Sequence, residues 1–196
     1  MSTPSSPASS AEPRRGAARA ALRAATHDAH ARLDALFGAF DLADPADYGR
    51  FLSAHARALS AVEPAIEAAG LAEALPDWPV RRRREAIAAD LAALGLPVAE
   101  PLEAALPPGR AAAWGLAYVL EGSRLGGGLL ARQVAPGLPR AYLAQPQPPG
   151  AWRKFLELLE IALYDRASID RGIEGALAAF AAFEAAGKAA QETSPP

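Results

Sequence analysis

Apolar residues recur every three or four positions along most of this chain, which is the period of an amphipathic α-helix. The clearest run covers residues 17–37. Its apolar stripe consists of Leu22, Ala25, Ala29, Leu33 and Leu36. A second helix is predicted from Asp44 to about residue 69, because an acidic N-cap followed by proline at the first helical position is a typical helix start.

Four further segments have the same helical character, at about residues 79–94, 109–134, 152–167 and 169–188. Residues of high helix propensity dominate them, and no strand-like alternation of apolar and polar positions stands out. A Pro- and Gly-rich connection covers residues 136–150. The predicted fold class is therefore all-α, a single bundle-like helical domain.

The two ends of the chain are predicted to lie outside this domain, which we place at residues 16–188. Residues 1–15 carry almost no large apolar side chains and are predicted to be a disordered tail, and residues 189–196 are predicted to be frayed. No stretch reaches the roughly 18 uncharged apolar residues of a membrane span, and the start lacks the apolar core of a secretory signal. These features predict a cytoplasmic protein that does not associate with membranes.

The composition removes several kinds of chemistry. The chain of 196 residues is 51% hydrophobic, enough for one core, and its net charge of −2 argues against general nucleic-acid binding. It has no cysteine, which excludes disulfides, thiolate catalysis, zinc–cysteine sites and iron–sulfur clusters. Only three histidines are present, so a histidine cage for a metal is not expected, whereas a single axial histidine is compatible with the sequence.

The first predicted helix carries the first candidate site. Arg23 and His30 are seven residues apart and fall on nearly the same stripe, and Asp34 follows His30 by one turn. A carboxylate one turn away can accept a hydrogen bond from an imidazole that ligates a metal, and Arg23 could hold an anionic group of a large ligand. The same spacing also fits a half-buried polar residue with solvated neighbours. His27 is the alternative ligand, and His55 is interpreted as a satisfied core or rim histidine.

The second candidate site is a glycine-rich stretch inside the fourth predicted helix. Gly122, Gly126, Gly127 and Gly128 interrupt an apolar pattern that continues beyond them. Because an interior glycine costs a helix about 1 kcal/mol relative to alanine, these positions favour close approach of a flat ligand or of another helix. The alternative is a helix end followed by a glycine-rich loop. The stretch has no Walker lysine and follows no strand, so a phosphate loop is not expected.

Other charged and aromatic residues have more ordinary interpretations. The run Arg81–Arg84 is predicted to be a solvated surface patch, with docking of an electron donor as the alternative. Arg153 is interpreted as a charge at a helix start that could reach carboxylates. Phe180 and Phe183 are predicted core aromatics that could also form one wall of a pocket for a planar ligand.

The two candidate sites together resemble the biliverdin-producing haem oxygenases, most closely the bacterial branch associated with phytochromes and iron acquisition. The resemblance rests on Leu22-Arg-Ala-Ala-Thr-His-Asp-Ala-His-Ala-Arg-Leu-Asp34 and on Tyr118-Val-Leu-Glu-Gly-Ser-Arg-Leu-Gly-Gly127. The motifs occur in the order and at about the separation found in the family, and the likeness covers about residues 20–187. It implies a helical fold in which haem lies between the two motif-bearing helices.

The resemblance also implies roles for individual residues. His30 matches the axial ligand of the iron, with Asp34 after it and the basic Arg23 before it, whereas His27 does not fit this frame. The second motif is similar to the helix that crosses the opposite face of the haem. The family glycines there match Gly122, Gly126 and Gly127. Ser123 stands where members of the mammalian type carry an aspartate that orders water, a departure shared by other members of the bacterial branch, so the resemblance does not say which group orders water here.

Two weaker local matches complete the implied site. Arg153 is similar in place to a basic residue that meets the haem propionates, and Phe180 to an aromatic residue that lines the pocket.

The function implied by the resemblance is oxidative opening of haem, which is both cofactor and substrate. Cleavage at a meso carbon with O₂ and electrons gives biliverdin, iron and carbon monoxide. The electrons would come from an external donor of the ferredoxin or flavoprotein type, and a phytochrome could receive the biliverdin. Two alternatives remain: a haem- or bilin-binding protein of the same fold without turnover, and a helical interaction protein without a pocket between the two helices.

Overall fold

The computed structural model describes residues 16–98 and 100–192, and these residues form helices and connecting loops with no strand. The longer helices are α1 (Ala17–Phe37), α2 (Pro45–Ala68), α5 (Arg84–Ala93), α6 (Arg110–Leu130), α8 (Ala151–Ala162) and α9 (Arg166–Glu192). Short helices lie between them: α3 (Leu71–Ala74), α4 (Trp78–Arg81) and α7 (Ala141–Ala144). The predicted all-α class is confirmed.

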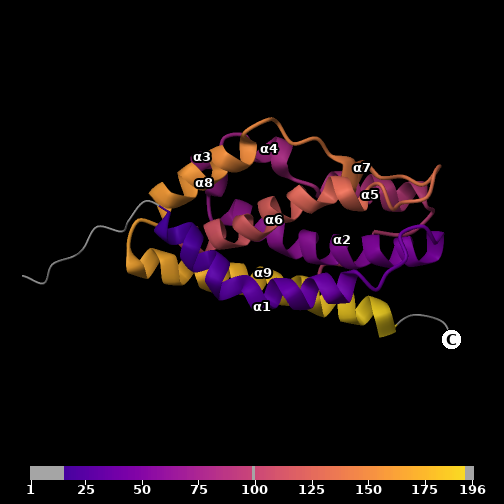
Figure 1. Cartoon of the computed structure of the whole chain (residues 1–196), viewed down its shortest axis with the longest axis horizontal. Coiled ribbons are helices and arrows are strands. Elements are labelled where there is room, and N and C mark those ends of the chain that lie inside the picture. The colour runs from indigo at the N-terminus through magenta and orange to yellow at the C-terminus, as the bar shows by residue number, and fades with distance from the viewer. Residues whose placement is uncertain (1–15, 99, 193–196) are drawn as a thin grey trace, which may run out of the picture.

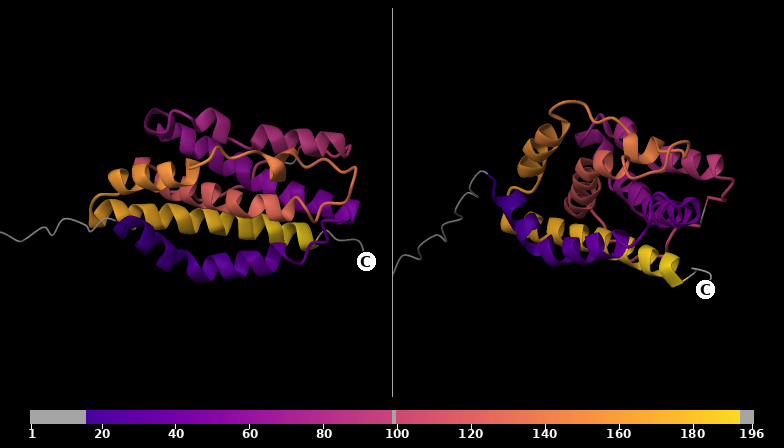
Figure 2. Two further views of the ribbon diagram at one scale, coloured as in Figure 1. Left: turned by 45° about the horizontal axis from the view of Figure 1, so that its top comes forward. Right: turned by 45° about the vertical axis from the view of Figure 1, so that its right-hand side comes forward.

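The long helix α9 organises the bundle, because α1, α2 and α6 all pack against it. Figure 2 (left) shows α9 lying between α1 and α6, and Figure 1 shows all three running roughly along the long axis of the molecule. The two helices that carry the sequence motifs, α1 and α6, therefore lie on either side of α9 and both pack against it.

The first half of α6 touches α9 backbone to backbone. A Cβ atom added to Gly115 would lie 1.8 Å from the Gly172 carbonyl oxygen, and one added to Gly175 would lie 2.0 Å from the Ala112 oxygen. No side chain fits such a crossing. Near the other end of α6, a Cβ added to Gly126 or Gly128 would meet nothing within 4 Å. Gly126 lies on the same side of α6 as Gly115, so the close contact of the two helices does not continue to the glycine-rich stretch.

The predicted helix boundaries are close for the first two helices. Asp44 is the N-cap of α2, and its carboxylate accepts a hydrogen bond of 2.8 Å from the Asp47 amide, as expected for an acidic cap before proline. The predicted end of the last helix is too early, because α9 continues to Glu192. Residues 193–196 and the predicted N-terminal tail at 1–15 lie outside the described residues.

The helix predicted at residues 79–94 is wrong in one respect, because it is two helices separated at Arg82 and Arg83. The buried carboxylate of Glu63 explains the break. It accepts hydrogen bonds from the backbone amides of Arg83 (2.7 Å) and Arg84 (3.3 Å) and so caps the start of α5. This partner lies 20 residues away in the sequence, so the local pattern could not reveal it.

The arginine run is also not the solvated patch that the sequence predicts. Arg81 and Arg83 are only 5% exposed. Arg81 forms an ion pair with the buried Glu121 of α6 and another, at 2.7 Å, with Asp77. Buried charges need such partners, so this segment connects α4 and α5 to α6 through its side chains. In residues 16–98 and 100–192 no helix is both long and apolar enough to span a bilayer.

Candidate functional site

One wall of the candidate site is the face of α1 around His30. The His30 Nδ1 atom lies 2.8 Å from an Asp34 carboxylate oxygen, and the His30 side chain is 64% exposed. Its Nε2 atom has no hydrogen-bond partner in the described part of the chain. The ring centre of Phe180, on α9, lies 6.0 Å from that of His30. The predicted pair is therefore formed, and the imidazole keeps one nitrogen available beside an apolar ring.

Basic residues continue this wall toward the N-terminus of α1. A hollow of about 410 Å³ is lined by Arg19, Ala20, Arg23, Ala24 and His27. Burial raises the pKa of the Tyr118 phenol on α6, and the nearby charges of Arg19 and Arg23 oppose that rise. The two arginines therefore act on a side chain of the opposite wall, and His27 lies at the edge of the same hollow.

The opposite wall is the glycine-rich half of α6. Gly126 and Gly128 face open space, and a Cβ added to Gly122 would meet only the Trp152 ring, at 3.9 Å. Leu125 and Leu129 are 57% and 63% exposed, which is unusual for large apolar side chains of one helix. Gly122, Leu125, Gly126 and Leu129 lie on one side of the helix and together form an apolar surface that a ligand could cover, whereas Gly128 lies on the side opposite Gly126. We call the region between this surface and the His30 face of α1, where the resemblance places the haem, the cleft.

Gly127 differs from its neighbours. A Cβ added there would lie 2.9 Å from the carbonyl oxygen of Leu143, in the α7 segment. Gly127 is buried, so its lack of a side chain permits close packing of this loop. The two explanations offered by the sequence, ligand approach and helix packing, thus apply to different glycines of the same stretch.

Behind this wall lies a small polar cavity of about 60 Å³. Its polar lining includes His55, Arg83, Ser123 and Tyr142. Arg83 donates a hydrogen bond of 2.8 Å to the Ser123 hydroxyl, which in turn donates to the Leu120 carbonyl. The Arg83 guanidinium also lies 5.2 Å from the centre of the Tyr142 ring. A buried arginine is thus the polar partner of Ser123.

His55 has the core position that the sequence predicts for it. Its Nδ1 atom lies 2.9 Å from the Phe51 carbonyl oxygen, and its ring contacts those of Phe37 and Phe183. Burial lowers the pKa of His55 to about 4, although the hydrogen bond to Phe51 opposes this. The ring is therefore neutral near pH 7, and it adjoins the polar cavity.

Arg153 is the predicted site residue that the structure does not bring to the others. Its side chain is 84% exposed and lies 3.8 Å from Glu157 of the same helix. None of its contacts within the described ranges reaches α1 or α6. Phe180, in contrast, is 5% exposed and lies beside His30, so it is both a core aromatic and part of the cleft.

Tyr118 and Arg83 are the site residues that sequence reasoning missed. Tyr118 lies within the second motif and precedes Gly122 by one helical turn. This spacing places both residues on the same side of the helix and could have identified Tyr118 from the sequence. Arg83 carried no such signal, because one arginine in a run of four cannot be singled out before the fold buries it.

Comparison with known proteins assigns the family. No model of a known protein family matches the chain. The chain is 38% identical over 150 residues to a haem oxygenase of Xanthomonas campestris, covering 71% of this chain and 88% of the relative. It is 31% identical over 151 residues to the haem oxygenase PigA of Pseudomonas aeruginosa, covering 71% and 75%.

A solved structure agrees with these relatives. The haem oxygenase of Neisseria meningitidis, determined with bound NO and CO, superposes with a TM-score of 0.71 at 26% identity, over 90% of this chain and 92% of that one. Identity above 30% across most of a relative, together with this structural match, confirms the resemblance drawn from the two motifs. The chain belongs to the haem oxygenase family.

Proposed function

We propose that the chain acts as a haem oxygenase through the cleft between α1 and α6, where the Nε2 atom of His30 would bind the haem iron. The observation that carries this assignment is the state of the His30 ring. Nδ1 is held by Asp34 at 2.8 Å, while Nε2 is unpaired and the side chain is 64% exposed beside Phe180. The products are biliverdin, iron and carbon monoxide.

The residues of the cleft fit a flat apolar ligand that carries carboxylates. An added Cβ atom at Gly126 would enter open space, and the exposed Leu125 and Leu129 on the same side of α6 offer an apolar surface to a ring system. At the N-terminal end of α1, Arg19 and Arg23 supply positive charge for acidic groups. The order of these features along the helices matches a macrocycle with propionates at one edge.

Each side chain contributes binding, orientation or protection rather than the oxidation itself. When bound, haem supplies the iron that activates dioxygen and is also the substrate that is opened at a meso carbon. Asp34 would accept a hydrogen bond from Nδ1 of His30 and so fix the tautomer that leaves Nε2 able to bind the iron. Arg23, with Arg19 and the Tyr118 hydroxyl, would hold the propionates and thereby determine which meso carbon faces α6.

The polar cavity offers a substitute for the acid that Ser123 replaces. A cavity of about 60 Å³ with several polar groups can hold ordered water. We infer that Arg83, Ser123 and the neutral His55 hold that water near the glycine-rich wall. Because no carboxylate lines this cavity in the described part of the chain, a proton would move through water and hydroxyl groups rather than through an acid.

The proposal includes partners that supply electrons and receive the product. A donor of the ferredoxin or flavoprotein type is needed because the sequence carries no nucleotide or flavin motif, and such donors are available in the cytoplasm, where we place the protein. A phytochrome that takes up biliverdin fits the branch of the family that the motifs resemble. Arg153 remains a predicted propionate contact.

The assignment is tested by adding haemin to the protein and then a reducing system in air. We expect a Soret band that decays as absorption appears in the red. His30→Ala should abolish the six-coordinate spectrum, whereas His27→Ala, an exposed histidine three residues earlier on α1, is the matched control and should keep it. A stable Soret band under reduction would indicate a binding protein without turnover, and the reverse behaviour of the two variants would overturn the ligand assignment.

A further inference from the structure

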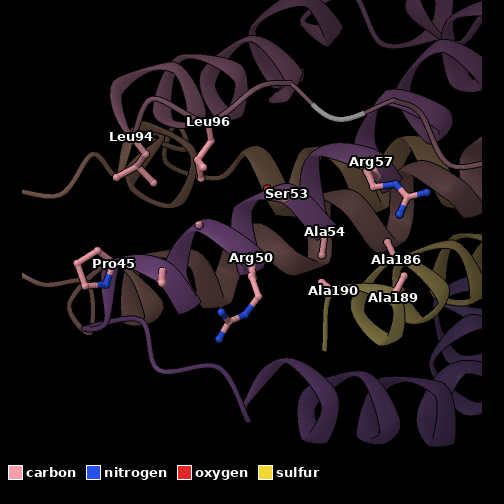
Figure 3. A pocket seen from close by; sticks show the side chains of 12 residues that line it. Pro45, Arg50, Ser53, Ala54, Arg57, Leu94, Leu96, Ala186, Ala189 and Ala190 are labelled. Carbon is pink, nitrogen blue, oxygen red and sulfur yellow. The ribbon is translucent and has the colours of Figure 1, made fainter. Parts of the chain in front are cut away.

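A second hollow lies apart from the haem cleft, where α2, the segment after α5 and the end of α9 meet. Its volume is about 500 Å³, within the roughly 300–1,000 Å³ typical of small-molecule sites. Figure 3 shows Leu94 and Leu96 on one side of α2 and Ala186, Ala189 and Ala190 of α9 on the other. The lining is mainly apolar, and many of its side chains are small, which leaves room for the apolar part of a ligand. We call this hollow the α2 groove.

The polar lining of the α2 groove is a stripe of α2. Arg50, Ser53 and Arg57 follow one another at helical spacing, and Figure 3 shows both arginines extending from this helix. Arg50 forms one hydrogen bond, of 2.7 Å, to Asp47, but its Nε atom is buried without a partner. The Arg57 guanidinium has no partner in the part of the chain that the structure describes. Two incompletely satisfied cations therefore border an apolar space.

This arrangement selects an anion with an apolar body. Guanidinium groups bind carboxylates well because their donors match the two oxygens. Arg57 follows Arg50 by seven positions on α2, which corresponds to a rise of about 10 Å along the helix. A ligand that satisfies both would therefore carry two acidic groups on flexible arms and bury an apolar core against the alanines and leucines between them.

We propose that the α2 groove is a second binding site for the open-chain tetrapyrrole product. Biliverdin is apolar, flexible and bears two propionates, so it has the required chemistry, and the inference rests on the proposed function for the presence of this ligand. Binding here would hold released product outside the cleft, which frees the cleft for the next haem.

The test uses protein whose cleft is filled with haemin, without reductant, so that added biliverdin meets only sites outside the cleft. Equilibrium dialysis should give one bound equivalent of biliverdin. Arg57→Ala and Arg50→Ala should each weaken this binding about tenfold, the loss expected for one charge-assisted hydrogen bond. Arg166→Ala, which removes an arginine that is 89% exposed at the other end of α9, should change nothing.

A second variant keeps both charges and fills the space. Ala190→Phe should abolish the added equivalent while circular dichroism and the Soret band stay normal. Excess succinate, a dicarboxylate without an apolar body, should not displace biliverdin. The proposal is overturned if haem-loaded wild-type protein binds no biliverdin, if Arg50→Ala and Arg57→Ala both bind it as tightly as wild type, or if succinate competes equally. Failure to form a Soret band would instead count against the proposed function, and the groove would then be tested by the arginine variants on the haem-free protein.

Discussion

The α1 wall of the cleft presents the His30–Asp34 pair, which forms within one helix turn, whereas the α6 wall depends on side chains from distant segments. His30 and Asp34 are both exposed and need only the helix that carries them. Ser123 and Gly127 are set by Arg83, from the α4–α5 junction, and by Leu143, from the α7 segment. The ligand motif is thus local, while the chemistry of the opposite face is a property of the whole fold.

The largest predicted difference between the walls is in stability. Arg83→Met keeps the length of the side chain but leaves the Ser123 hydroxyl without its donor and removes one of the two side-chain donors to the Leu120 carbonyl. We expect the free energy of unfolding of the haem-free protein to fall by about 3 kcal/mol. Asp34→Ala removes an exposed pair and should cost about 0.5 kcal/mol. Urea unfolding measures both, and equal losses would contradict the contrast between the walls.

The histidine behind the α6 wall should make stability depend on pH. The pKa of His55 falls from 6.5 to about 4 because the ring is buried, so between these values the unfolded chain binds a proton that the folded chain does not. The free energy of unfolding should therefore decrease as the pH falls from 6.5 to 4, by at most about 3 kcal/mol. His55→Leu should flatten this part of the curve relative to wild type. Identical slopes would show that His55 does not contribute.

Two adjacent glycines give the smallest and most local test. Gly127→Ala places a methyl group 2.9 Å from the Leu143 oxygen and should destabilise the haem-free protein by about 1–2 kcal/mol. Gly126→Ala enters open space and should stabilise it by about 0.5–1 kcal/mol through helix propensity. In the haem titration, however, Gly126→Ala should weaken binding, because its methyl group occupies the cleft. The same sign for both variants in the unfolding experiment would remove the distinction between the two glycines.

Regions that sequence analysis predicted well are those whose partners are close in the chain. The period of α1, the Asp44–Pro45 start of α2 and the spacing of His30 from Asp34 all depend on contacts within a few residues. The errors have one physical cause. The break between α4 and α5 depends on the Glu63 carboxylate, and the burial of Arg81 depends on Glu121, partners 20 and 40 residues away.

The sequence by itself determined the helical class and the family, and it singled out His30 and Asp34 as a candidate pair, because helical periodicity and short-range motifs express these directly. Only the tertiary structure decided which side chains would be buried and what would satisfy them. The start of α1 illustrates this: Gly16 offers no side-chain cap, and Glu160 of α8 instead accepts the Arg19 amide at 2.8 Å. A buried polar group must find a partner wherever the fold provides one, and that choice is not encoded at any single position.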